Sequence, residues 1–169
     1  MTQSSHLATL SDLNHHYVRS VDQADVKWFD QHLAQDFMLS GLGDVVCRQW
    51  RESDSSIWEV RGPLRHYTFS KVMCWAALDG LLKLHDDGAL VLASAKLDAF
   101  GRERAAIEQA IERRGFNAAL GSYTSVLDGD KVDASLLLMA CVGYRDAGDP
   151  RMSVTFCWQV ILSPTKTGA

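Results

Sequence analysis

The sequence predicts a mainly α-helical protein, and three observations lead to that prediction. Apolar residues recur at spacings of three and four along most of the chain after Val45. Aspartate, proline and glycine stand where these helical patterns begin and end. No segment after Val45 shows the apolar and polar alternation of a convincing half-buried sheet. Helix packed on helix is therefore the expected architecture for this part of the chain.

The N-terminal region has a different pattern, which predicts two helices and a strand. Residues 7–21 carry Leu10, Leu13, Tyr17 and Val21 on one helical face. A second short helix is expected after a cap at Asp25, with its buried side supplied by Trp28, Phe29 and Leu33.

The stretch DFMLS, residues 36–40, reads as a short strand, and GLGD, residues 41–44, reads as a break. Because the pattern changes there, the sequence predicts a boundary between residues 1–44 and residues 45–169.

The second region predicts several helices joined by loops. A helical turn or two is followed by a polar loop, and a dense apolar pattern predicts a core helix that is covered on most of its circumference. The expected elements are the turns at 45–50, the loop at 51–56, the core helix at about 68–84, an amphipathic helix at 98–114 that stops at Gly115, a helix from the cap Asp133 to Gly143, and a helix that starts at Asp149 and Pro150.

The composition favours a soluble globular protein and excludes several classes of function. The chain is 47% hydrophobic and 22% charged, and its formal charge of -4 offers no basic surface for nucleic acid. No apolar run is long enough to cross a bilayer and no signal peptide is evident, so a cytoplasmic location without membrane partners is expected. The four cysteines lack a CxxC pair and are expected to be buried, reduced thiols.

Metal and cofactor sites are not expected. His15 and His16 point to different helix faces, and His32 adds no carboxylate to complete a set of ligands. Gly41 and Gly43 fall short of a phosphate-binding GxGxxG motif, which needs a third glycine after a strand. Asp133 and Asp149 are better explained as helix caps than as catalytic groups.

One short stretch, IWEVRGPLRH, gathers the residues expected to form a site. The Glu59 carboxyl group stands beside Ile57 and Trp58, and a loss of hydration there would favour its protonated form, as a general acid requires. Indole rings commonly stack on the apolar faces of sugars, and Arg61 and Arg65 could bind hydroxyl or carboxylate groups. His66 is expected either to contact this loop or to line the site, and the sequence leaves both open.

Longer motifs connect this stretch to a known family. The run CRQWRESDSSIWEVRGPLRHYTFSKVMCWAALD, followed by RGFNAALGSYTSVLDGDKVDASLLLMACVGYRDAGDPRM, strongly resembles bacterial members of glycoside hydrolase family 15, the glucoamylase and trehalase-like enzymes. The resemblance covers about residues 45–164, and the motifs follow the family's order and spacing. A weaker resemblance, to the start of an NTF2-like (SnoaL-like) domain, covers about residues 7–40.

The family resemblance implies a partial (α/α)6 toroid and an inverting hydrolysis of α-glucosidic bonds by two carboxylic acids. It assigns the general acid to Glu59 and makes Trp58, Arg61, Arg65 and His66 candidates for binding a carbohydrate substrate. In such enzymes the partner carboxylate stands about 6.5–9.5 Å away, which leaves room for the attacking water.

The resemblance also implies that part of the site lies elsewhere. The family's general base and its later sugar-binding motif fall beyond Ala169, and the early arginine and aspartate pair is absent. We therefore expect a fragment that carries the acid without the base and is inactive alone, with apolar helix faces that favour self-association. The alternatives are an NTF2-like module that binds a small molecule and a fusion product without function.

Overall fold

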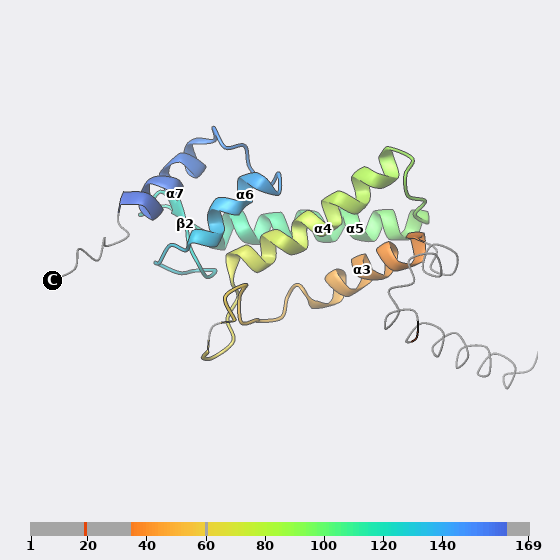
Figure 1. Ribbon diagram of the computed structural model, residues 1–169, viewed down its shortest axis with the longest axis horizontal. Coiled ribbons are helices and arrows are strands. Elements are labelled where there is room, and N and C mark those ends of the chain that lie inside the picture. Colours follow the sequence, from red (N-terminus) through yellow and green to blue (C-terminus); the bar gives the residue numbers. More distant parts are fainter. Residues whose placement is uncertain (1–18, 20–34, 60, 162–169) are drawn as a thin grey trace, which may run out of the picture. The chain divides into compact units, whose positions relative to one another are not determined.

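The structure is a computed structural model that describes residue 19 and residues 35–59 and 61–161 (Figure 1). The chain divides into two compact units, residues 1–39 and 40–169, and nearly all described residues belong to the second. Two helices were expected at residues 7–33. Only Arg19 of this range is described, and it is helical. The other residues of the range, including His15, His16 and His32, lie outside the described residues. The described elements are mainly helical, as predicted: α3 (Gln35–Gln49), α4 (Thr68–Asp86), α5 (Ser94–Ala110), η1 (Ile111–Gly115), β1 (Phe116–Asn117), β2 (Ser122–Tyr123), η2 (Ala134–Leu137), α6 (Leu138–Cys141) and α7 (Pro150–Ile161).

Helices α4 and α5 lie side by side and form the centre of the second unit (Figure 1). Val72 and Leu78 of α4 and Phe100 and Ile107 of α5 are fully buried. In α4, Val72, Trp75 and Leu78 follow one another at a spacing of three, and in α5 Phe100 and Ile107 are seven positions apart, so each set lies on one side of its helix. The apolar periodicity of the sequence therefore marks the faces that meet in the core.

Helix α3 corrects two expectations from the N-terminal pattern. The strand predicted at residues 36–40 and the break predicted at residues 41–44 are both wrong, because the helix runs unbroken through these positions. A Cβ atom at Gly43 would lie 2.3 Å from Cζ of Phe100, so this glycine permits close packing of α3 on α5. The signal read as a turn is instead a helix contact, and the boundary proposed at residues 41–44 lies inside α3.

Polar contacts at the end of α3 fix it to α5. The Trp50 indole Nε1 donates to Glu103 Oε2 at 2.7 Å, and Arg51 pairs with the same oxygen at 2.8 Å. Lys96 Nζ pairs with Asp44 Oδ2 at 2.8 Å. Burial would raise the pKa of Glu103, but the bonds from Trp50 and Arg51 outweigh it and lower that pKa.

The other predicted helices are present with changed boundaries. The core helix predicted at 68–84 is α4, and the helix predicted at 98–114 is α5, which begins four residues earlier and continues as the π-helix η1 to Gly115. A Cβ atom at Gly115 would lie 2.9 Å from Thr68 Cγ2, so close packing accounts for this glycine. The antiparallel pair β1 and β2 has two residues in each strand and supplies the only strands in the described part of the chain.

Both predicted aspartate caps are confirmed. The Asp133 carboxylate accepts from the Ser135 backbone N at 2.8 Å at the start of η2, and Asp149 accepts from the Arg151 backbone N at 2.8 Å at the start of α7. Gly143 follows α6 with φ +72°, a conformation that favours glycine, and confirms the predicted helix end.

One expectation about burial is confirmed and one is wrong in part. Of the 19 residues of α4, only Met73, Lys83, Leu84 and Asp86 are exposed, so the helix is covered around most of its circumference, as predicted. All four cysteines are free thiols, but Cys141 and Cys157 are exposed rather than buried. Burial raises the pKa of the Cys47 and Cys74 thiols. Within residues 35–59 and 61–161, no helix is both long and apolar enough to cross a bilayer.

Candidate functional site

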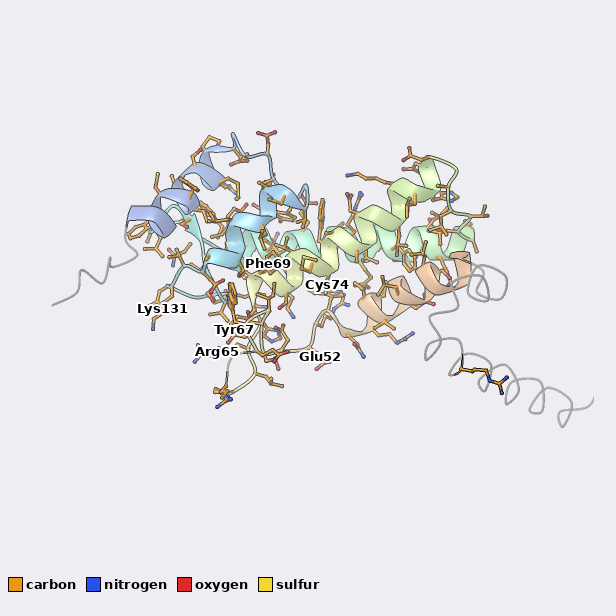
Figure 2. All side chains as sticks on the ribbon, viewed as in Figure 1. Glu52, Arg65, Tyr67, Phe69, Cys74 and Lys131 are labelled. Carbon is orange, nitrogen blue, oxygen red and sulfur yellow. The ribbon has the colours of Figure 1, made fainter. Side chains whose placement is uncertain are left out.

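The segment that carries the predicted site residues forms a closed loop between α3 and α4. Asp54 and Arg65 exchange two backbone hydrogen bonds, of 2.8 and 3.0 Å, in an isolated antiparallel bridge. We call the segment between these two residues the Glu59 loop. Figure 2 shows Arg65 and Tyr67 on the chain that leads from this loop into α4. The bridge thus brings the two ends of the loop together at the N-terminal end of α4.

The Asp54 carboxylate fixes the start of the loop to α4. Its Oδ1 accepts from the Ser56 backbone N at 2.8 Å and from Ser70 Oγ at 2.7 Å, and its Oδ2 lies 3.4 Å from Lys71 Nζ. The Lys71 side chain is only 3% exposed, and its Nζ also donates to the Glu52 carbonyl oxygen at 2.6 Å. A buried ammonium with these partners binds the loop firmly to the first turn of the helix.

The other end of the loop is held by a neighbouring segment. The His66 carbonyl oxygen accepts from the Leu127 backbone N at 2.9 Å, and Tyr67 forms an isolated bridge with Val126. Tyr67 is buried, whereas His66 is half-buried. The backbone of His66 therefore contacts residues 126–127 and not the turn around Glu59.

The tip of the loop has a contact of its own. The Trp58 indole Nε1 lies 3.0 Å from Oδ1 and 3.1 Å from Oδ2 of Asp133, to which it donates. Asp133 is the cap of η2, so one carboxylate serves both the helix and the loop. The contact occupies the N–H edge of the indole, and Trp58 as a residue remains 57% exposed.

Glu59 lies at the exposed tip in a strained turn. Its backbone N donates to the Ser56 carbonyl oxygen at 3.1 Å, and both residues have positive φ, +47° for Glu59 and +67° for Ser56. Residues without the freedom of glycine adopt this conformation rarely, and such strain is concentrated at functional sites. Among the described residues, none bonds the Glu59 carboxylate.

The expected loss of hydration at Glu59 is wrong for this structure. Glu59 is exposed, and the two apolar neighbours that were expected to cover it are exposed to 53% for Ile57 and 57% for Trp58. The indole turns its N–H edge to Asp133 and does not cover the carboxyl group. Solvent therefore surrounds the proposed acid.

The five predicted site residues lie on one segment, and among the described residues no hydrogen bond or ion pair joins the side chain of one to that of another. Trp58, Glu59 and Arg61 lie at the exposed tip, and Arg65 lies at the closing bridge. His66 follows on the chain into α4. The structure thus brings the candidates into one loop but does not assemble them around a common point.

An open groove of about 970 Å³ lies beside this loop, and the sequence did not predict it. Residues 52–56 line one part with polar groups, and the rest is lined mostly by apolar side chains of α3, α4 and α6, together with polar Gln49, Ser70 and Lys71. Ile57 belongs to its lining and Glu59 does not. Met73 and Leu138 line this groove and are exposed, but both stand within apolar runs of the sequence, so no sequence signal set them apart.

A second glutamate, also missed by the sequence analysis, forms a dense polar cluster. Glu112 Oε1 accepts from Tyr144 OH at 2.7 Å, from Tyr123 OH at 2.8 Å and from Arg145 at 2.9 Å, while Oε2 pairs with Arg151. We call these five residues the Glu112 cluster. They come from η1, β2, the segment after α6, and α7, so the cluster joins elements that are distant in sequence.

The cluster stabilises the ionised form of Glu112. Burial would raise the pKa of Glu112, but the hydrogen bonds from Tyr144, Arg145 and Tyr123 outweigh burial and lower it. Burial and the neighbouring Glu112 charge raise the pKa of Tyr123 to about 12, and burial and the Glu112 bond also raise the pKa of Tyr144. A carboxylate with these donors is a structural anchor and a poor proton donor.

Comparisons with known proteins now identify the family. The sequence model described as "Glycosyl hydrolases family 15" matches residues 15–163, which include most of the segment 7–40 that also resembled an NTF2-like domain. The chain is 36% identical to a trehalase of Mycolicibacterium smegmatis over 118 residues, which cover 70% of this chain and 17% of the relative. It is 31% identical to trehalase 2 of Sulfolobus acidocaldarius over 143 residues, which cover 84% of this chain and 23% of the relative.

The chain spans about a sixth to a quarter of the length of these curated relatives, 17% and 23%. No solved structure matches it significantly. The family match covers far more than half of the residues and agrees with the motifs around Glu59 and with the helical architecture. The chain belongs to glycosyl hydrolases family 15.

Proposed function

We propose that Glu59 is the general acid of an inverting hydrolysis of α-glucosidic bonds, with trehalose or a related glucoside as the substrate. The observation that carries the proposal is the family match over residues 15–163, within which the Trp58–Glu59 pair lies at the tip of a solvent-facing loop. The trehalase names of the relatives support trehalose as the first substrate to test.

In this proposal Glu59 protonates the glycosidic oxygen as the bond to the anomeric carbon breaks. A second carboxylate must activate the water on the opposite face of the sugar, about 6.5–9.5 Å from the acid. The family resemblance puts that base outside these 169 residues. The chain accordingly supplies one of the two catalytic groups, and turnover by the chain alone is expected to be weak.

The neighbours of Glu59 are proposed to bind the sugar. Trp58 is 57% exposed although its Nε1 edge bonds Asp133, and this exposed indole is proposed to stack on a glucose ring. Arg61 is exposed two residues from the acid and can donate to sugar hydroxyls. Arg65 and His66 lie nearer the base of the loop and are assigned to outer contacts.

The test compares Glu59→Gln with the parent chain on trehalose and maltose. Isothermal titration is expected to give a similar Kd for both proteins, because glutamine keeps the size of the side chain. Residual hydrolysis, followed as glucose release, is expected to fall by at least about 100-fold, because glutamine has no acidic proton to give.

Glu108→Gln is the matched control, since Glu108 is exposed on α5 away from the loop and is expected to leave both quantities unchanged. Equal hydrolysis by Glu59→Gln and the parent chain would refute the acid assignment. Failure of the parent chain to bind either sugar would refute the assignment of the loop to sugar binding.

The alternative of an NTF2-like binding module needs a curved sheet around a pocket. The described residues contain only the short strands β1 and β2, and the strand expected at residues 36–40 is helical. No specific observation favours this second function.

A further inference from the structure

We propose that Asp133 is a positioning residue for the Glu59 loop, acting through the Trp58 indole. This inference rests on the proposed role of Glu59 as the acid. Both Asp133 oxygens lie within 3.1 Å of Trp58 Nε1, although the two residues are 75 positions apart in the sequence. It is the one side-chain hydrogen bond that the described tip residues 57–59 and 61–64 make to another part of the chain.

The strain in the loop explains why its tip needs an anchor. Ser56 and Glu59 flank the short turn at positive φ, +67° and +47°, a conformation that costs free energy for residues other than glycine. The backbone bond from Glu59 to Ser56 is local and can form in many orientations of the tip. A contact from the intervening Trp58 to a capped helix start restricts those orientations.

Asp133 is well placed to be this support because its own position is fixed. Its carboxylate accepts from the Ser135 backbone N at 2.8 Å and also from Ser135 Oγ, which holds it at the start of η2. Asp133 does not bond Glu59, so it would act on the acid only by holding the adjacent residue. The rate of a reaction that depends on a general acid falls steeply when the acid is displaced from the leaving-group oxygen. A residue that holds the acid in place therefore raises the reaction rate.

The experiment measures how often the loop opens. Limited trypsin digestion of the full chain cuts after Arg61, at the exposed tip, and mass spectrometry follows that cut. Asp133→Ser keeps a residue that caps helices but is too short to reach the indole. Trp58→Phe removes the donor and leaves the cap intact, and the double variant tests whether the two changes act through one contact.

We expect each single variant to raise the rate of cutting after Arg61 about fivefold, the effect of losing one hydrogen bond of ordinary strength. The double variant should also show about fivefold, because the second change removes nothing further. Asp133→Asn, which keeps an acceptor oxygen, should restore most of the protection. Cutting after Arg102, on α5, serves as the reference for global unfolding.

An unchanged rate in Asp133→Ser would overturn the proposal, and so would a double variant that multiplies the two effects to about 25-fold. A parallel rise in cutting after Arg102 would also overturn it, because the whole unit would then be loosened. Glu59→Gln is expected to keep the parent rate of cutting.

Hydrolysis separates this inference from the proposed function. On trehalose, Asp133→Ser should lower kcat about fivefold, and Asp133→Asn should recover it. Glu59→Gln could keep full hydrolysis while Asp133→Ser still raises the rate of cutting after Arg61. In that case the acid assignment would fail, and Asp133 would remain the support of the loop. A normal kcat in Asp133→Ser would refute its role in positioning the acid.

Discussion

The Glu59 loop and the framework formed by α4, α5 and the Glu112 cluster differ in how they are held. Fully buried side chains such as Leu78 and Ile107 join the helices of the framework. The described residues of the loop are attached at its two ends and at Trp58, and its tip is exposed. The difference indicates that stability is concentrated in one region and the proposed chemistry in the other.

Glu112 and Glu59 differ in the same way as the two regions that contain them. Glu112 accepts from four side chains, and the described residues offer none to the Glu59 carboxylate. A carboxylate whose oxygens are occupied by donors is held in its ionised form, whereas an exposed one can exchange protons with a substrate. Changes in the framework should therefore alter the free energy of unfolding, and changes at the tip should alter activity.

The largest expected effect is that of Gly43→Ala in α3, where this helix packs on the framework helix α5. The new Cβ atom would lie 2.3 Å from Cζ of the fully buried Phe100, so either the Phe100 ring or the two helices must shift. We expect the free energy of unfolding to fall by about 2–3 kcal/mol, measured by urea denaturation.

Gly41→Ala is the matched control in the same helix. Among the described residues, no atom beyond Gly41's chain neighbours and the backbone of its own helix lies within 4 Å of a Cβ at Gly41, so alanine should raise the free energy of unfolding by up to about 1 kcal/mol through helix propensity. Equal effects of the two substitutions would show that α3 does not pack closely on α5.

A smaller effect is expected for Glu112→Gln. The neutral amide leaves Arg145 and Arg151 without their carboxylate, and the Glu112 side chain retains 20% exposure, which weakens the loss relative to a fully buried pair. We expect a decrease of about 1–2 kcal/mol at pH 7 in thermal or urea unfolding.

The same variant makes a prediction about pH. The pKa of Glu112 is lower in the folded chain than its ordinary value of 4.5, so its stabilising contribution is complete above about that pH. The contribution is lost as the pH falls through the lower folded value. The stability difference between Glu112→Gln and the parent should therefore shrink below pH 4.5, and a constant difference down to pH 3 would contradict it.

The smallest effect on stability is expected at Glu59. Glu59→Gln should change the free energy of unfolding by less than about 0.5 kcal/mol, because the exposed side chain has no bond from the described residues. Urea denaturation of Glu59→Gln and Glu112→Gln under the same conditions compares the two changes in the free energy of unfolding. A loss at Glu59 as large as that at Glu112 would remove the contrast between the two regions.

Local sequence signals predicted the helical framework well. The periodic apolar residues of α4 and α5 and the caps at Asp133 and Asp149 are where the sequence placed them. These features depend on neighbours within a few positions, so a single sequence contains them. The assignment of Glu59 came from a family resemblance, and its catalytic role stays a prediction.

The errors came from contacts between distant residues. Gly43 was read as a turn because its partner, Phe100, lies on another helix. The donors of Glu112 stand up to 39 positions away, and the Trp58 partner stands 75 away, so spacing along the chain could indicate neither. The exposure of Glu59 likewise depends on what surrounds the loop in space and not on the residues beside it in sequence.

The bridge between Asp54 and Arg65 has a consequence for how such a domain can diversify. Because the bridge joins the two ends of the Glu59 loop at the start of α4, residues between them can be exchanged, inserted or deleted while the helix keeps its place. If the proposed function holds, substrate preference could then evolve through changes in the Glu59 loop alone, while the helices keep their sequence and packing.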